Sequence, residues 1–355
     1  MNIVITGICG FVGSELATEM RSRFPDARVA GIDNLSRRGS ERTRPVLERA
    51  GIPVRHGDIR CASDVDALGD ADWVIDAAAN PSVLAGVDGR SSGRQVVEHN
   101  LFGTVNLLEY CARRRVGFVL LSTSRVYSVA ALQALPLAVS SDAFVPRADS
   151  SWPSGAGPDG LREEFSTASP VSLYGATKRA SEIVALEYGD AYGFPVVVNR
   201  CGVLAGAGQF GTAEQGIFSY WVRAWAAGRP LKYSGFGGGG YQVRDALHPR
   251  DLADLIERQI RDGAEAGGVW NIGGGAGNAM SLARLSEWCR HRFGQRDVAV
   301  DSATRRWDVP WIVMDATAAA TRFGWRRTRS IADILGEIAD HHDRHPEWLG
   351  VSGIP

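Results

Sequence analysis

A glycine-rich turn directly after the first apolar segment constrains the fold of this chain more than any other feature. The apolar residues 2–6 are followed by Gly7-Ile8-Cys9-Gly10-Phe11-Val12-Gly13, and helical spacing begins at Phe11. Glycines allow a tight turn, close packing of the helix on the strand and approach of the backbone to a pyrophosphate. The N-terminus of the helix adds N–H groups that favour phosphate. The segment predicts a strand–turn–helix unit that binds a dinucleotide through Gly7, Gly10, Phe11, Val12 and Gly13.

Short apolar segments alternate with helical patterns through the first half of the chain. The apolar segments are residues 2–6, 28–32, 53–56, 73–77, 118–121 and 195–199, and the clearest helical stretches are 11–23, 95–113 and 174–192. Such alternation is typical of βαβ units with helices on both faces of a parallel sheet. We therefore predict an α/β protein with a Rossmann-like, doubly wound parallel sheet.

The composition changes twice along the chain, and these changes suggest how it is organised. Residues 128–165 are rich in Ser, Pro, Gly and Ala and predict a long loop or excursion, which is usually functional when it occurs in a compact domain. After residue 201 the pattern becomes mixed, with short strands, glycine clusters and helices at 282–293 and 331–342. We expect a dinucleotide-binding domain at 1–200 and a smaller, discontinuous mixed α/β lobe at 201–355.

The composition also excludes several classes of protein. The formal net charge is -1, with 39 Lys+Arg against 40 Asp+Glu, which gives no basic excess for nucleic acid. No apolar run approaches the roughly 18 residues of a membrane span. The five cysteines are scattered and lack the spacing of metal ligands, so we expect reduced thiols, a cytoplasmic protein and no metal.

An acidic residue follows the second predicted strand, 20 residues after the last glycine of the turn. A carboxylate at this position, Asp33, can accept hydrogen bonds from the adenine ribose and would repel a 2′-phosphate. The sequence therefore favours NAD over NADP as the cofactor. Arg37 and Arg38 lie just beyond and leave NADP open.

Two segments carry candidate catalytic groups. The apolar strand before Ser122 would deliver a hydroxyl at its end, and Tyr174-Gly175-Ala176-Thr177-Lys178 opens a helical stretch. One helical turn separates Tyr174 from Lys178, so both side chains point to the same side. An ammonium group favours the phenolate and would lower the tyrosine pKa, which gives a base for a hydroxyl proton. Tyr-x-x-x-Lys alone is a weak signal, because it occurs by chance on many helices.

Together these segments resemble the extended short-chain dehydrogenase/reductase (NAD-dependent epimerase/dehydratase) superfamily, which acts on nucleotide sugars. The resemblance runs over nearly the whole chain. Besides the glycine turn, Ser122–Tyr127 and Tyr174–Lys178, it is carried by residues 33–35, 57–59, 76–79, 100–104, 244–245 and 271–274.

The resemblance implies a role for each matching residue. Asn34, Asp58, Ile59, Ala77, Ala78 and Ala79 would border the cofactor, and Asn100 would support the central helix on the cofactor side. Thr123 would hydrogen-bond the reacting hydroxyl or carbonyl, and Tyr174 would be the acid/base. Lys178 would bind the nicotinamide ribose and depress the pKa of Tyr174. NAD would be tightly bound and regenerated in each turnover.

Within the superfamily the chain is most similar to the CDP-paratose 2-epimerase (CDP-tyvelose epimerase) group. This similarity rests on residues 122–128, 164–167, 172–178, 199–204 and 242–245 and on the long segment before Glu164. Sugar-nucleotide 4,6-dehydratases carry Asp-Glu directly after the catalytic Thr, whereas Ser124 and Arg125 stand here and disfavour dehydration. The resemblance implies inversion of carbon 2 through a transient keto sugar. Inversion of carbon 4 of a UDP-glucose-type substrate, net reduction or decarboxylation, and a non-catalytic NAD(P)-sensing protein remain alternatives.

The remaining predictions concern the substrate end. A diphosphate needs cations or N–H donors, and Arg244 and Arg305 match the family's arginine positions. We also assign Ser124, Arg125 and Asn199 to substrate binding, and expect residues 209–215 and 233–238 to surround the nucleotide base. Many relatives pair two helices that correspond to 95–113 and 174–192, so a homo-oligomer, dimer or tetramer, is expected.

Overall fold

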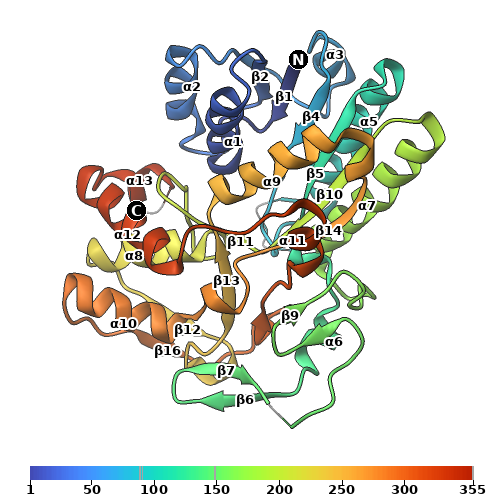
Figure 1. Cartoon of the computed structure of the whole chain (residues 1–355). Coiled ribbons are helices and arrows are strands. Elements are labelled where there is room, and N and C mark those ends of the chain that lie inside the picture. Colours follow the sequence, from blue (N-terminus) through green and yellow to red (C-terminus); the bar gives the residue numbers. More distant parts are fainter. Residues whose placement is uncertain (88, 90, 148, 354–355) are drawn as a thin grey trace.

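A parallel sheet of seven strands forms the centre of the protein (Figure 1). The computed structural model describes residues 1–353 apart from 88, 90 and 148. The strand order is β14-β10-β5-β4-β1-β2-β3, and every neighbouring pair is parallel. The strands are β1 (Asn2–Thr6), β2 (Arg28–Asp33), β3 (Val54–His56), β4 (Trp73–Asp76), β5 (Gly117–Thr123), β10 (Val196–Cys201) and β14 (Gly268–Ile272). This order reverses between β1 and β4, as in doubly wound sheets, and confirms the predicted fold class.

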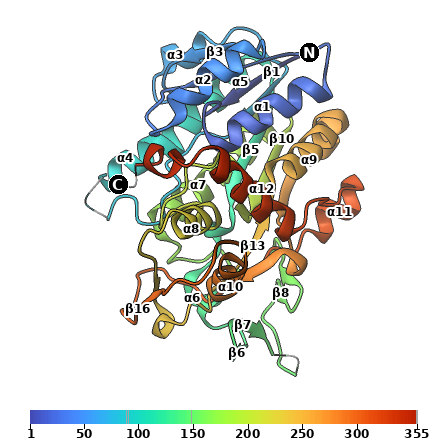
Figure 2. The ribbon, with the colours of Figure 1, turned by 90° about the vertical axis from the view of Figure 1, so that its left-hand side faces the viewer.

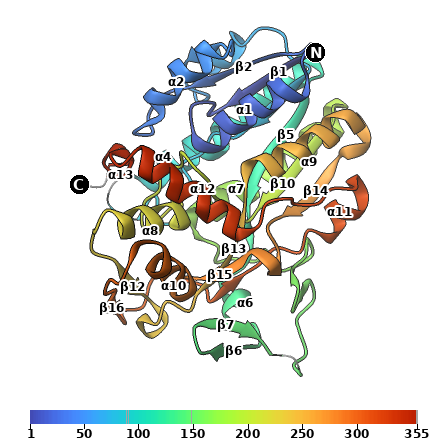
Figure 3. The same cartoon turned by 60° about the vertical axis from the view of Figure 1, so that its left-hand side comes forward.

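Helices cover both faces of this sheet. On one face lie α1 (Phe11–Arg23), α9 (Pro249–Asp262) and α11 (Thr317–Phe323); on the other lie α3 (Ala62–Asp66), α5 (Gly103–Arg114) and α7 (Ser172–Tyr192). Figure 3 shows α1 and α9 side by side over the sheet. Along β1, Ile3 and Ile5 pack with α1 and α9, whereas Val4 packs with α5, as the two-residue period of a strand requires. Burial on both faces explains why the strands are uniformly apolar.

The helix predicted over residues 95–113 is one continuous helical rod of three parts. It comprises α4 (Gly93–Val97), a turn of π-helix at Glu98–Phe102 and α5. Single π-turns inside α-helices often lie at functional sites. This turn carries Asn100, one of the residues predicted on the cofactor side.

A sheet of four strands, a separate pair of strands and a group of helices form the smaller lobe of the molecule. β13 (Val243–Leu247) pairs with β11 (Val203–Leu204), β15 (Ala279–Ser281) and β17 (Trp311–Ile312), and β12 (Lys232–Ser234) pairs with β16 (Ala299–Asp301). The helices α8 (Ile217–Ala226), α10 (Leu282–Phe293), α12 (Ile331–Arg344) and α13 (Trp348–Val351) share a core of their own. The division near residue 200 stays a prediction, and α9 and β14, although late in the sequence, pack with the first sheet.

The segment predicted as a long loop contains short regular elements. It holds α6 (Val129–Gln133), the hairpin of β6 (Leu137–Ser140) and β7 (Ala143–Pro146), and the pair β8 (Ala156–Gly157) and β9 (Gly160–Leu161). Leu161 hydrogen-bonds through its backbone to Val313 and Asp315, and the excursion shares a core with β17. Figure 2 shows β6 and β7 at the end of the molecule away from α2 and α3. Residue 148 of this excursion, and residues 354–355 of the second lobe, lie outside the described residues.

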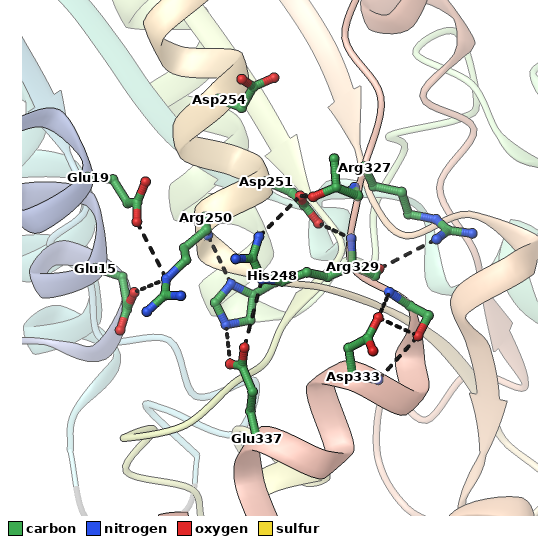
Figure 4. Close-up of polar contacts among 12 residues, drawn as sticks. Glu15, Glu19, His248, Arg250, Asp251, Asp254, Arg327, Arg329, Asp333 and Glu337 are labelled. Atoms are coloured by element: carbon green, nitrogen blue, oxygen red, sulfur yellow. Dashed lines mark hydrogen bonds and ion pairs between the residues drawn. The ribbon is translucent and has the colours of Figure 1, made fainter. Parts of the chain in front are cut away.

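Polar contacts at the start of α9 join α1 to α12 (Figure 4). Arg250 pairs with Glu15 at 3.3 Å and Glu19 at 3.4 Å, both on α1. His248 Nε2 contacts Glu337 Oε2 on α12 at 2.9 Å, while His248 Nδ1 accepts a hydrogen bond from Arg250 N. The helix that follows the glycine turn is thereby tied to the helices of the second lobe.

In the part of the chain that the structure describes, no helix is long and apolar enough to cross a membrane.

Candidate active site

A cavity of about 640 Å³ opens at the carboxyl ends of the strands on both sides of the switch between β1 and β4. This is the place where doubly wound sheets bind their ligands. One end of the cavity is lined by the glycine turn and residues after β2, and the other by residues 305–308 before β17. The walls between them come from β4, β5, α7, β10 and the segment 209–218.

The glycine turn forms a cradle that larger residues would fill. A Cβ atom at Gly13 would lie 2.2 Å from Gly7 O. A Cβ atom at Gly7 would lie 2.9 Å from Ala78 Cα, and Gly7 itself has a φ of +61°. Gly7, Gly10, Phe11, Val12 and Gly13 all line the cavity. The first turn of α1 therefore exposes its backbone N–H groups to a bound pyrophosphate, and the residues present fit NAD.

Asp33 ends β2 and faces the same cavity. Its Oδ2 accepts a hydrogen bond from Cys9 N at 2.9 Å and its Oδ1 from Leu35 N at 2.8 Å, so backbone groups orient the carboxylate. Burial raises the pKa of Asp33 above its ordinary value. Arg37, which would be the partner of a 2′-phosphate, instead donates to Gln215 Oε1 and Phe210 O. Both arrangements fit NAD better than NADP.

The other predicted cofactor residues also lie around this end of the cavity. Asn34 Nδ2 donates a hydrogen bond to Asp58 Oδ2 at 3.0 Å. Burial alone would raise the pKa of Asp58, but hydrogen bonds from Arg60 and Asn34 outweigh it and hold the pKa well below its usual range. Ile59 lies directly beneath Gly103 of α5. The lining residues predicted from the sequence are Asn34, Asp58, Ile59, Ala77, Ala78 and Ala79.

Thr123 and Tyr174 line the middle of the cavity, as predicted. Thr123 is the last residue of β5, and its hydroxyl accepts a hydrogen bond from Arg125 N at 3.2 Å, which caps the 3-10 turn Ser124–Val126. Tyr174 lies in the first turn of α7 and is 7% exposed. A hydrogen bond from Thr123 lowers the pKa of the phenol, but burial outweighs it.

The predicted lowering of the Tyr174 pKa by Lys178 stays a prediction. Burial raises the pKa of Tyr174 to about 12, and the groups that lower it are the Thr123 hydroxyl and the Arg125 charge. Lys178 is 2% exposed; burial lowers its pKa, and the charges of Asp76, Glu182 and Cys201 oppose that shift. Cys201 lines the cavity, whereas Lys178 is not among the lining residues. Lys178 lies on the same side of α7 as Tyr174, one helical turn further along the helix.

A buried ion pair fixes α7 against the sheet. Glu182, which is fully buried, accepts hydrogen bonds from Arg200 of β10 at 2.8 Å and from Ser122 of β5 at 2.5 Å. Arg179 adds a third contact at 2.9 Å. This carboxylate was not predicted from the sequence, because nothing local distinguishes Glu182 from a surface glutamate of α7. It holds the helix that carries Tyr174 beside the strand that carries Thr123.

Three arginines converge at the far end of the cavity. Arg125, Arg244 and Arg305 all line it, and each lies close enough for its charge to act on the others. Burial lowers the pKa of Arg244 to about 9, with the Arg125 charge adding to the effect. Arg244 donates to Val243 O and Val309 O at 2.7 and 2.9 Å, and Asp308 is the nearby carboxylate. Ser124 lines the cavity beside them.

Besides Lys178, two further predicted site residues, Asn199 and Asn100, do not line the cavity. Asn199 is fully buried and exchanges two hydrogen bonds with Gln259 of α9, at 2.9 and 2.8 Å, because it lies two residues below the end of β10. The structure therefore does not support its predicted contact with substrate. Asn100 is 1% exposed and binds the backbone of Asn80 and the hydroxyl of Thr177, so it supports the cavity wall rather than lining it.

The segment after β11 lines the cavity more extensively than the sequence suggested. Gln209, Phe210 and residues 213–218 all face it, whereas residues 233–238 do not. Cys201 lines it at the end of β10, and burial raises the pKa of its thiol to about 12, so it is not an ionised nucleophile. Sequence spacing identifies residues that belong to one helix or strand. The lining residues of segment 209–218 and Cys201 come together through contacts between distant segments, which spacing does not record.

Comparison with known proteins places this site in a family. Residues 3–273 match the model of the NAD dependent epimerase/dehydratase family, and the chain belongs to that family. The cofactor is accordingly NAD.

Among curated relatives, the chain is 28% identical to dTDP-glucose 4,6-dehydratase of Streptomyces antibioticus, over 98% of this chain and 94% of the relative. It is 29% identical to CDP-paratose 2-epimerase of Salmonella typhi, over 80% of this chain and 82% of the relative. These relatives include both epimerases and dehydratases, so the family does not by itself define the reaction.

Solved structures share the fold. UDP-glucuronic acid 4-epimerase from Bacillus cereus, in complex with UDP-glucuronic acid and NAD, superimposes with a TM-score of 0.77 at 22% identity, over 97% of this chain and 99% of the other. Thermus thermophilus UDP-glucose 4-epimerase in complex with NAD gives 0.76 at 24% identity, with the same coverage.

Proposed function

We propose that this protein is an NAD-dependent epimerase that inverts carbon 2 of a CDP-linked sugar of the paratose/tyvelose type. The observation that carries the proposal is the pair of residues after Thr123. Ser124 and Arg125 line the cavity where a dehydratase needs two carboxyl groups to eliminate water. A hydroxyl and a guanidinium cannot perform that acid/base chemistry near neutral pH.

In this proposal Thr123 and Tyr174 act on one hydroxyl of the sugar. Thr123 hydrogen-bonds the sugar oxygen, and Tyr174 removes its proton. The glycine turn and Asp33 would hold NAD, which would accept the hydride from the carbon that bears this hydroxyl and give it back to the opposite face of that carbon. The keto sugar rotates inside the cavity so that its opposite face is presented, and Tyr174 then returns the proton to the oxygen.

The substrate end is assigned by charge. Arg244 and Arg305 would bind the diphosphate, and Asp308 would compensate part of the positive charge that they share with Arg125. Segment 209–216 would cover the nucleotide parts of the substrate and of NAD. A homo-oligomer and a cytoplasmic location belong to the same proposal; the first rests on the resemblance to relatives and the second on the scattered cysteines.

A substrate panel with isotope analysis tests the reaction. CDP-paratose should be epimerised without added cofactor, and in deuterated water the product should carry no solvent deuterium at the inverted carbon. Deuterium at that carbon would contradict hydride return. UDP-glucose turnover to its carbon 4 epimer would establish the alternative 4-epimerase, and conversion of dTDP-glucose to a 4-keto-6-deoxy sugar would establish a dehydratase.

The Tyr174→Phe variant tests the acid/base assignment. It removes the phenol oxygen but keeps the ring that packs in the cavity wall, so NAD should remain bound. Turnover should fall at least 100-fold, the range of general acid/base catalysis. NAD content after gel filtration and product formation would be measured together. Normal turnover by this variant would contradict the assignment.

A further inference from the structure

We infer that Gln242 is a positioning residue whose amide holds the Asp308 carboxylate away from the arginines of the cavity. Arg244 and Arg305 thereby stay free to bind the diphosphate of a nucleotide-linked sugar. The inference rests on the proposed function for its ligand, whereas the contacts that carry it are between residues of the chain.

The Asp308 carboxylate is held from two sides. Gln242 Nε2 donates to its Oδ2 at 3.1 Å, and the backbone N–H of Val309 donates to its Oδ1 at 3.0 Å. Gly235 follows β12 with a φ of +76°, and a Cβ atom there would lie 2.3 Å from Asp308 Oδ2. The glycine therefore lets the carboxylate lie against the turn after β12.

The orientation of the Gln242 amide is fixed by two acceptors. Its Nε2 donates to Ser234 O at 2.8 Å as well as to Asp308, and a flipped amide would place its oxygen against two oxygens. Gln242 is 8% exposed, and its Oε1 is buried without a hydrogen-bond partner among the described residues. Buried polar groups are normally paired, so this side chain holds Asp308 and Ser234 at the expense of its own oxygen.

Two arginines lie within reach of the Asp308 side chain. Arg244 Nη2 donates to Val309 O at 2.9 Å, so its guanidinium lies beside the residue that follows Asp308. Arg305 O accepts from Asp308 N at 3.3 Å, within one turn of the chain. All three side chains line the same cavity, where an Arg–carboxylate pair would be a strong, charge-assisted contact. In the described part of the chain, Asp308 forms no ion pair with either arginine, and its carboxylate is bound to the Gln242 amide instead.

Gln242 and Arg244 act on the same face of the molecule. They are two residues apart at the start of β13, so both side chains point to one side, and both line the cavity. A guanidinium paired with Asp308 would have to give up that partner before it could bind phosphate. The apparent affinity for a diphosphate would then fall in proportion to the fraction of molecules in which the arginine is unpaired.

A double-mutant cycle on the NAD-loaded protein tests this role. Gln242→Met keeps the length of the side chain but removes the amide, so the Asp308 carboxylate can rotate toward the arginines. The Kd of CDP, measured by isothermal titration calorimetry, should rise about tenfold, the effect expected for one hydrogen bond to a charged group. In an Asp308→Asn background, which has no carboxylate to pair, the same change at Gln242 should alter the Kd less than about twofold. In turnover of CDP-paratose the loss should appear in KM with kcat unchanged, because it concerns binding shared by ground state and transition state.

A control and a second variant separate this role from a general effect on the fold. Gln133→Met is the matched control, because Gln133 Nε2 donates to the backbone oxygen of Asp308 at 2.8 Å and not to its carboxylate. It should leave the Kd within about twofold of the wild type. Gly235→Ala displaces the carboxylate by another route, since the added methyl group would meet Asp308 Oδ2. It should also weaken CDP binding, Asp308→Asn should again cancel the loss, and this cycle decides the matter if Gln242→Met does not fold.

Unchanged affinity for CDP in Gln242→Met and Gly235→Ala would overturn the inference. A loss that persists in the Asp308→Asn background would also overturn it, since Gln242 would then act on the nucleotide directly or through the fold. UDP, dTDP and GDP are titrated in parallel. If the wild type binds one of these but not CDP, the proposed CDP-sugar function fails, and the cycle is completed with that nucleotide. If it binds none of the four, the arginines are not a diphosphate site and the inference fails.

Discussion

At the scale of single residues, the site depends on small groups that allow close approach. Gly13 and Gly175 each face a backbone oxygen that a Cβ atom would meet at 2.2 and 2.3 Å. Real Cβ contacts are not so short, so a side chain at either position would push two segments apart. The absence of a side chain at Gly13 keeps the shape of the cofactor cradle. Its absence at Gly175 allows the segments that carry Thr123, Arg125 and Tyr174 to meet.

The Gly13→Ala variant should lose NAD. The added methyl group displaces Gly7 or the start of α1 and moves the N–H groups that would hold the pyrophosphate. We expect NAD content after gel filtration to fall at least tenfold, measured by absorbance of the released nucleotide. Gly336→Ala is the matched control, because no atom lies within 4 Å of its Cβ position in α12. It should keep NAD and gain roughly 0.5–1 kcal/mol of stability from the higher helix propensity of alanine. Retention of NAD by Gly13→Ala would show that the turn can relax.

At the scale of secondary-structure elements, the position of α7 decides whether Tyr174 meets Thr123. The buried carboxylate of Glu182 bonds to groups on β5 and β10, and these contacts set the register of the helix on the sheet. A buried charged pair is costly to break, since removal of one partner leaves the other charge uncompensated.

Glu182→Gln should destabilise the protein strongly. The neutral amide leaves the buried charge of Arg200 without its counter-ion, and the expected loss is about 3–5 kcal/mol in the free energy of unfolding. Denaturant unfolding followed by circular dichroism measures it. Glu187→Gln, on the exposed face of the same helix, should change stability by less than about 0.5 kcal/mol. Similar stability of the two variants would show that the pair contributes little.

At the scale of the whole molecule, both halves of the chain enclose the cofactor end of the cavity. Segment 209–216 is held on one side by Arg37 and on the other by Trp348 of α13, whose ring stacks on Phe210 with centroids 5.2 Å apart. Trp348 Nε1 also donates to Gln209 O at 3.3 Å. We therefore expect these contacts to open when a bound dinucleotide is released.

Trp348→Ala should accelerate the release of NAD. A stacked aromatic pair contributes about 0.5–1.5 kcal/mol, so release should become up to about tenfold faster. The rate would be followed by exchange of bound NAD for isotopically labelled NAD. Trp288→Ala, which removes a half-buried tryptophan of α10 that packs on Phe293, is the control and should leave the rate unchanged. An unchanged rate in Trp348→Ala would mean that segment 209–216 does not limit release.

Features that depend on local period and on residue type could be predicted from the sequence. Apolar runs and helical spacing predicted the parallel sheet and the bounds of α1 and α10, and the glycines located the cofactor cradle. Tyr174 was indicated by the spacing Tyr-x-x-x-Lys at the start of a helical stretch, and Thr123 by the family resemblance of the segment Ser122–Tyr127. The three-dimensional structure was needed to show that Asn199 pairs with Gln259, that Arg37 binds segment 209–216, and that the excursion packs on β17. It was also needed to show that burial raises the pKa of Tyr174 and lowers that of Lys178. Solvation and charge at a buried atom depend on residues far apart in the sequence, and no local pattern records which of them become neighbours.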